Sequence, residues 1–165
     1  MKAIVIFDTL FGNTQRIAQD LAKGLKETGT EADLANIHEV RIEELSKYKL
    51  FVIGAPTQYL TASKPMKEFL ERLEGLDLAG KYSFAFDTKL GSPLSGSAAK
   101  YIEKKLSKVG LQIIRPRASA IVVGKKKSSD QVGNSVLKES MEDDFIAIGR
   151  ELGAVLQKVA NVGAQ

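Results

Sequence analysis

Apolar residues recur in short, strand-length runs that alternate with stretches of helical spacing. Runs rich in β-branched and aromatic residues predict buried strands, whereas strands of a half-exposed sheet would alternate with polar residues. A fifth strand is expected in two pieces, because Arg115-Pro116-Arg117 interrupts it. The predicted strands are residues 2–8, 30–37, 50–54 and 82–86, then 111–114 with 120–123.

Helical periodicity fills the segments between these strands. From Asn13 onward Ile17, Leu21 and Leu25 recur at helical spacing until Gly29 ends the pattern. A short helical piece is expected near residues 42–45, and longer helices after Ser63, from 98 to 109 and from 140 onward. The last helix is expected to begin with a capping box, formed by Ser140 and Asp143.

Strands that alternate with helices predict right-handed crossovers and a parallel sheet covered on both faces. The chain has 165 residues and contains neither an internal repeat nor a linker, so residues 1–165 are expected to form a single domain. Five strands in a chain of this length favour a three-layer α/β sandwich with the strand order 2-1-3-4-5.

Composition narrows the chemistry that such a domain can perform. The chain has no Cys and one His, His38, which argues against disulfides, thiolate metal sites and a Ser-His-Asp triad. Its net charge of +4 suits either an ordinary soluble protein or one with an acidic partner. We expect no nucleic-acid binding, no membrane insertion and a cytoplasmic location. The run Lys125-Lys126-Lys127 is expected in a solvated loop.

In a doubly wound sheet, ligands bind beyond the carboxyl ends of the strands, where the strand order reverses. The loop after the first strand joins it directly to a helix N-terminus, and it contains Thr9, Gly12, Asn13 and Thr14. Gly12 permits a positive φ, so the backbone N–H groups can turn toward an anion that the helix dipole also favours. A plain strand-to-helix turn, capped by a polar side chain, explains the same residues.

This segment resembles the phosphate loop of flavodoxins, whose usual form is Thr/Ser-x-Thr/Ser-Gly-x-Thr. Thr9, Gly12, Asn13 and Thr14 match that form, and Phe11 stands where the family has a hydroxyl. The resemblance extends over the whole chain and implies a flavodoxin-like fold with bound FMN. It implies a phosphate contact for all of the loop, namely Thr9, Leu10, Phe11, Gly12, Asn13 and Thr14.

The resemblance also assigns the loops after the third and fourth strands to the two sides of the flavin ring. Pro56, Thr57, Gln58 and Tyr59 belong to the first of these loops, and Tyr59 is expected to stack on the ring. Flavodoxins that specialise in one-electron transfer often carry a glycine there, but residues 55–63 contain none.

The loop after the fourth strand, residues 87–96, has no aromatic residue. By resemblance its backbone lies at the pyrimidine edge of the flavin, and Asp87 alternatively caps its own loop. The residues assigned to the flavin here are Asp87, Thr88, Lys89, Leu90 and Gly91.

Two functions fit these observations. The first is an FMN-dependent redox protein, either an electron carrier or a small oxidoreductase, that exchanges electrons with a partner protein or a small acceptor. The second is a flavodoxin-like module whose flavin site is degraded and which binds a protein partner instead.

Overall fold

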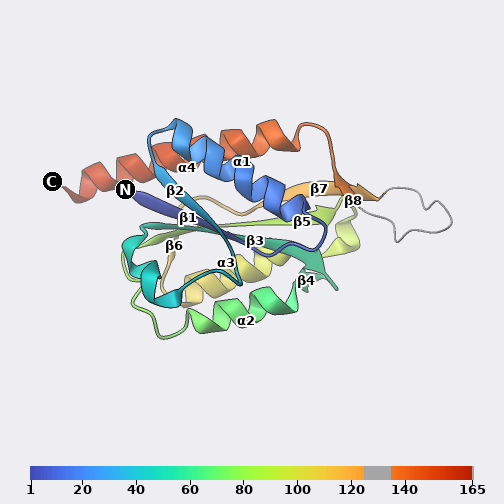
Figure 1. Cartoon of the computed structure of the whole chain (residues 1–165), viewed down its shortest axis with the longest axis horizontal. Coiled ribbons are helices and arrows are strands. Elements are labelled where there is room, and N and C mark those ends of the chain that lie inside the picture. Colours follow the sequence, from blue (N-terminus) through green and yellow to red (C-terminus); the bar gives the residue numbers. More distant parts are fainter. Residues whose placement is uncertain (125–134, 165) are drawn as a thin grey trace.

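The protein forms three layers, a central sheet between two pairs of helices (Figure 1). The structure is a computed structural model that describes residues 1–124 and 135–164, so Lys125-Lys126-Lys127 lies outside the described residues. Helices α1 and α4 cover one face of the sheet, and α2 and α3 cover the other. The helices are α1 (Asn13–Glu27), α2 (Lys64–Arg72), α3 (Ala98–Lys108) and α4 (Met141–Gly163), with 3-10 turns η1 (Ile42–Lys47) and η2 (Pro93–Ser95).

The sheet has the order β2-β1-β3-β5-β7-β8. Its first five strands are parallel and reproduce the predicted 2-1-3-4-5 core, so the fold prediction is confirmed. The edge strand β8 pairs antiparallel with β7 and was not predicted. The strands are β1 (Lys2–Phe7), β2 (Glu31–Asn36), β3 (Leu50–Gln58), β4 (Thr61–Ala62), β5 (Tyr82–Leu90), β6 (Gln112–Ile113), β7 (Ala118–Gly124) and β8 (Ser135–Leu137).

Alternate residues of the central strands enter two separate cores, as the pleat requires. Val5, Val52 and Phe84 pack against α1 and α4, whereas Ile4 and Phe51 pack against α2 and α3. Burial on both faces explains why these strands read as continuous apolar runs.

Two glycines let α1 and α4 approach each other closely. A Cβ atom added to Gly24 would lie 2.1 Å from the carbonyl oxygen of Ile146, and one added to Gly149 would lie 2.4 Å from that of Leu21. Backbone therefore meets backbone at this crossing, and no side chain larger than hydrogen fits there.

The predicted capping box of α4 is wrong. Ser140 precedes the helix with a φ of 74°, and its side chain makes no capping hydrogen bond. A capping side chain reaches the free N–H groups of a helix only when its own backbone is extended. In the left-handed conformation of Ser140, the hydroxyl is directed away from those N–H groups. The Ser140 hydroxyl instead lies 3.4 Å from a carboxylate oxygen of Asp144.

Asp20 of α1 faces the acidic first turn of α4. The pKa of its carboxyl is raised to about 6, chiefly by burial and also by the charges of Glu142 and Asp143, while Arg16 and Lys23 oppose the shift. A raised pKa means that the folded state favours the protonated acid. The stabilisation is complete below the unfolded pKa of 3.8, and it declines as the pH rises and is lost above about 6.

We therefore expect Asp20→Asn to stabilise the protein at pH 7.5 but not at pH 4. The gain should be roughly 1 kcal/mol, because Asp20 is partly exposed and solvent screens its neighbours' charges. Thermal unfolding at the two pH values measures this difference. An equal change in Tm at both values would contradict the assignment.

Candidate functional site

The loop from β1 to α1 is closed by its own hydrogen bonds. Gly12 is the N-cap of α1 with a φ of 88°, and its N–H donates to Thr9 Oγ1 at 3.0 Å. Arg16 N–H donates to the carbonyl of Gly12 at 3.1 Å, which starts the helix. The first N–H groups of α1 have no acceptor within the helix, so this end attracts an anion.

A pair of buried hydroxyl groups ties this helix to the sheet. Thr14 Oγ1 and Thr88 Oγ1 lie 2.9 Å apart, and both side chains are almost fully buried. Each hydroxyl has a single proton, so the pair uses one of the two for its mutual bond. The other proton can be donated to a ligand in the adjoining cavity.

The segment after Gly54, predicted as a loop, continues as strand and then turns back as a tight hairpin. β3 extends to Gln58 and pairs antiparallel with β4. Tyr59 and Leu60 form the two-residue turn with φ values of 47° and 70°, the pattern of a type I′ turn. Side chains are disfavoured at positive φ by about 1 kcal/mol or more, so other contacts must hold this turn in place.

The contact that holds the turn comes from the next loop. Leu60 forms an isolated bridge with Gly96, and the N–H of Ser97 donates to the Leu60 carbonyl at 3.3 Å. A Cβ atom on Gly96 would lie only 2.2 Å from that carbonyl oxygen. Gly96 therefore allows the β3–β4 hairpin and the connection from β5 to α3 to touch.

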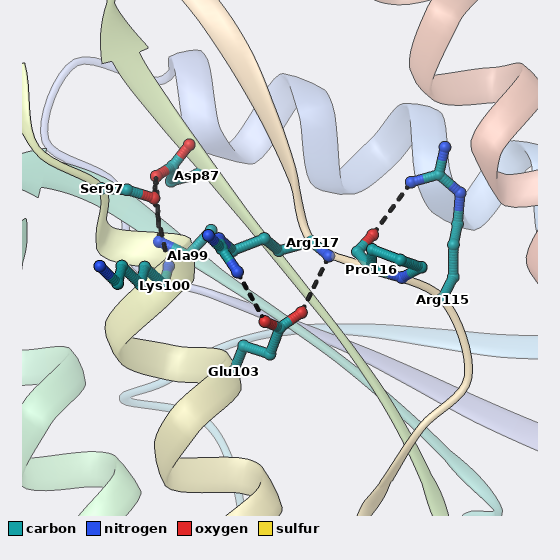
Figure 2. A network of polar contacts seen from close by, with 8 residues as sticks. All are labelled: Asp87, Ser97, Ala99, Lys100, Glu103, Arg115, Pro116 and Arg117. Atoms are coloured by element: carbon teal, nitrogen blue, oxygen red, sulfur yellow. Dashed lines mark hydrogen bonds and ion pairs between the residues drawn. The ribbon is translucent and has the colours of Figure 1, made fainter. Parts of the chain in front are cut away.

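Asp87 lies beneath these loops and faces α3 (Figure 2). One carboxylate oxygen accepts hydrogen bonds from Ser97 Oγ at 2.8 Å, Ala99 N–H at 3.0 Å and Thr57 Oγ1 at 3.2 Å. The other oxygen is buried without a partner among the described residues. Asp87 thus binds the N-terminus of α3, where the helix dipole favours a carboxylate.

A cavity of about 240 Å³ opens where β1, β3 and β5 end. It brings together eleven of the fifteen residues that the sequence predicted for the site, and it adds Val122 of β7. Val122 pairs with Leu90 in the sheet, a neighbour relation that the sequence alone does not reveal. The predicted residues that line it are Thr9, Leu10, Phe11, Asn13, Thr14, Pro56, Thr57, Gln58, Thr88, Lys89 and Leu90.

Four predicted residues do not line the cavity, namely Gly12, Tyr59, Asp87 and Gly91. Gly12 shapes the loop through its φ, and Asp87 points toward α3. The Tyr59 side chain is 99% exposed at the hairpin tip, so its stacking on a flavin stays a prediction.

The edge of the molecule around the cavity is strongly apolar. Three chain segments place large exposed side chains there, although such groups are usually scattered singly on a protein surface. The exposed side chains at this edge are Leu10, Phe11, Tyr59, Leu60, Leu90 and Leu94. A planar aromatic ligand would cover part of this surface while a polar end reached the β1–α1 loop.

The described residues contain neither a metal-binding cluster nor a membrane-spanning helix. No group of three or more His, Asp or Glu side chains among them could hold a metal ion. Within the same part of the chain, no helix combines the length and the apolar character needed to cross a membrane.

A family model described as Flavodoxin matches residues 5–133. The chain belongs to the flavodoxin family. This membership agrees with the strand order and with the position of the cavity.

Curated relatives of this flavodoxin-family protein are redox enzymes by name. Protoporphyrinogen IX dehydrogenase [quinone] of Escherichia coli K12 is 38% identical over 72 residues, which cover 44% of this chain and 40% of that protein. The chain thus matches less than half of that relative. An NAD(P)H dehydrogenase (quinone) of Brucella canis is 25% identical over 159 residues, covering 84% of this chain and 78% of the relative.

Solved flavodoxin structures share the fold over nearly the whole chain. A flavodoxin from the domain Archaea superposes with a TM-score of 0.77 at 20% identity, covering 95% of this chain and 99% of that one. Oxidised Flavodoxin 1 from Bacillus cereus gives 0.76 at 19% identity, with 92% and 97% covered.

Proposed function

We propose that this protein binds FMN in the cavity at the carboxyl edge of the sheet and passes electrons from a reductant to an acceptor. The observation that carries the proposal is the β1–α1 loop, because it joins a positive φ at Gly12, a helix N-terminus and the hydroxyls of Thr9 and Thr14. No atom lies within 4 Å of the place where a Gly12 Cβ would be, so the loop leaves open space there.

The residues present fit the two ends of FMN. Thr9, Thr14 and the first N–H groups of α1 would hold the phosphate by neutral donors, because residues 9–14 contain no Lys or Arg. Leu10, Phe11 and Leu90 would exclude water from the ring. Bound FMN would supply the capacity to take up and release electrons in either one or two steps.

Two features of the site favour transfer of electrons in pairs. Lys89 lines the cavity, and its ammonium group favours negative charge on a reduced ligand. A flip of the Tyr59–Leu60 peptide would change the turn toward type II′, which needs glycine where Tyr59 stands. The site therefore has no ready backbone movement to stabilise a half-reduced cofactor.

We expect an anaerobic reductive titration of the FMN-loaded protein to pass directly from the oxidised to the fully reduced spectrum. The two one-electron potentials should lie close together for the reasons given above. A stable long-wavelength absorption at the midpoint of the titration would contradict this expectation.

We infer a quinone as the class of acceptor. The names of the Escherichia coli and Brucella canis relatives support this inference, as does the apolar edge, which suits a flat and weakly polar molecule. The test is anaerobic reoxidation of the photoreduced protein by a soluble benzoquinone, followed by absorbance. Reoxidation no faster than that of free reduced FMN would exclude this acceptor class.

Visible absorption decides between FMN binding and the second function, a partner-binding module with a degraded site. The purified protein should carry flavin bands, or acquire them when it is mixed with FMN and freed of excess cofactor by gel filtration. A protein that stays colourless after this treatment would exclude the flavin function and favour the partner-binding module.

A further inference from the structure

Three lysines form an uncompensated stripe along α3. Lys100, Lys104 and Lys108 are exposed and four residues apart, so they lie on one side of the helix. Their ammonium groups make no hydrogen bond or ion pair with any other described residue. Like charges at this spacing repel each other and destabilise the helix, so the stripe lowers the stability of the free protein.

Two nearby lysines, in contrast, have acidic partners. Lys105 Nζ of α3 lies 3.6 Å from a carboxylate oxygen of Glu74, and Lys64 Nζ of α2 lies 3.8 Å from one of Glu68. The stripe differs from these two lysines in having no acidic partner among the described residues.

The stripe borders a groove of about 510 Å³ between α3 and the segment around β6. Ile113 of β6 lines the groove and is 44% exposed, which gives it an apolar contact point. We name this the α3 groove, bounded by Lys100, Lys104, Lys108 and Ile113.

The one acidic residue that lines the α3 groove is already engaged. Arg117 Nη1 lies 2.8 Å from one carboxylate oxygen of Glu103, and the Arg117 backbone N–H donates to the other at 2.9 Å (Figure 2). The Glu103 side chain is only 16% exposed. The described residues that line the groove therefore present free positive charge but no free carboxylate.

We propose that the α3 groove docks an acidic helical segment of a partner protein. Carboxylates one helical turn apart would match the spacing of the three lysines, since a turn rises about 5.4 Å in both helices. An apolar residue on the same face of the partner would contact Ile113. Charge complementarity and the concave apolar contact point together favour this occupant over a flat bilayer. Among the described residues that line the groove, no aromatic side chain is present to stack on nucleic-acid bases.

The docking does not require a flavin and so goes beyond the proposed function. The groove starts near the cavity, because α3 begins at Ala98, whose N–H donates to Thr57 Oγ1 at 2.9 Å. Thr57 in turn lines the cavity. The groove runs toward the opposite edge of the sheet, where Ile113 pairs with Ser83 at the start of β5.

The test uses isothermal calorimetry of the full-length protein at low salt. The probe is a synthetic 14-residue helical peptide with Glu at every fourth position and one Leu on the same face. The variant Lys100→Glu/Lys104→Glu/Lys108→Glu should weaken binding about tenfold or more, because it replaces attraction by repulsion. The matched control, Lys23→Glu/Lys26→Glu/Lys158→Glu, has the same net charge but alters the opposite layer, and it should bind within about twofold of wild type.

A second variant tests the groove without altering its charge. Ile113→Ser should weaken binding of the peptide with Leu, and it should not affect a peptide in which Ser replaces that Leu. Thermal unfolding monitored by circular dichroism identifies any variant that fails to fold.

Four outcomes would overturn the proposal. They are no binding of the peptide to wild type, an equal loss in the matched control, an unchanged affinity in Ile113→Ser, and a preference of the stripe for other anions. The last is measured with phosphatidylserine/phosphatidylcholine vesicles and a 12-base-pair DNA duplex. Tighter binding of either, abolished by the three α3 substitutions, would identify a membrane or nucleic acid as the occupant.

Discussion

A Gly12→Val variant should bind FMN at least about 30-fold more weakly than the wild type. Gly12 has a φ of 88°, a conformation in which a β-branched residue costs about 2 kcal/mol or more. A valine would relieve this strain by turning the loop, which would break the hydrogen bond to Thr9 and redirect the N–H groups of the loop. Calorimetric titration of the apoprotein with FMN measures the loss.

Gly12→Asn is the matched control for this prediction. Space around the Gly12 Cβ position is open, and asparagine tolerates positive φ far better than valine. The asparagine variant should therefore retain most of the affinity. Thr14→Ala, which removes one hydroxyl of the pair with Thr88, should have a smaller effect than Gly12→Val. An unchanged FMN affinity in Gly12→Val would refute the phosphate-binding role of this loop.

Gly149→Ala should lower the free energy of unfolding by about 2–4 kcal/mol, the range of severe packing defects. The added methyl group would lie 2.4 Å from the carbonyl oxygen of Leu21, so α1 and α4 would have to separate. Alanine would otherwise be favoured in a helix by up to about 1 kcal/mol, so the clash must exceed this gain. Urea denaturation measures the difference.

Gly163→Ala provides the comparison in the same helix. No atom lies within 4 Å of its Cβ position, so the substitution brings helix propensity without a clash. This variant should be as stable as the wild type or slightly more so. If Gly149→Ala behaved in the same way, the close approach of α1 and α4 would be wrong.

The sequence predicts the core of this fold because local pattern and tertiary burial agree there. The first and third parallel strands contain continuous apolar runs, and the helices between the strands keep one apolar stripe. The local sequence pattern fails to predict the structure where contacts between residues distant in the chain determine the backbone conformation. Tyr59-Leu60 lacks the Asn-Gly chemistry of a type I′ turn, and its geometry depends on Gly96, which lies 36 residues later than Leu60.

The candidate site was predictable for a different reason. Strand order alone brings the loops after β1, β3 and β5 to one edge, so Thr9, Thr14 and Lys89 could be grouped without any knowledge of side-chain direction. Side-chain direction was the part that could not be foreseen. Asp87 and Thr88 are adjacent in β5, yet the pleat sends Asp87 to α3 and Thr88 to α1.

The Leu60–Gly96 contact also bears on how long a ligand would stay in the cavity. It joins the hairpin to the β5–α3 connection, and Thr57 and Asp87 reinforce the junction from below. The β1–α1 loop has its own bond from Gly12 to Thr9, and the Thr14–Thr88 pair ties the helix that follows it to the sheet. The two walls thus differ, because the hairpin bonds to the β5–α3 connection whereas Gly12 bonds within its own loop. The residence time of a ligand in the cavity should therefore depend on how fast residues 9–12 open. Dissociation should require only this loop to move, while the hairpin and the β5–α3 connection stay in place.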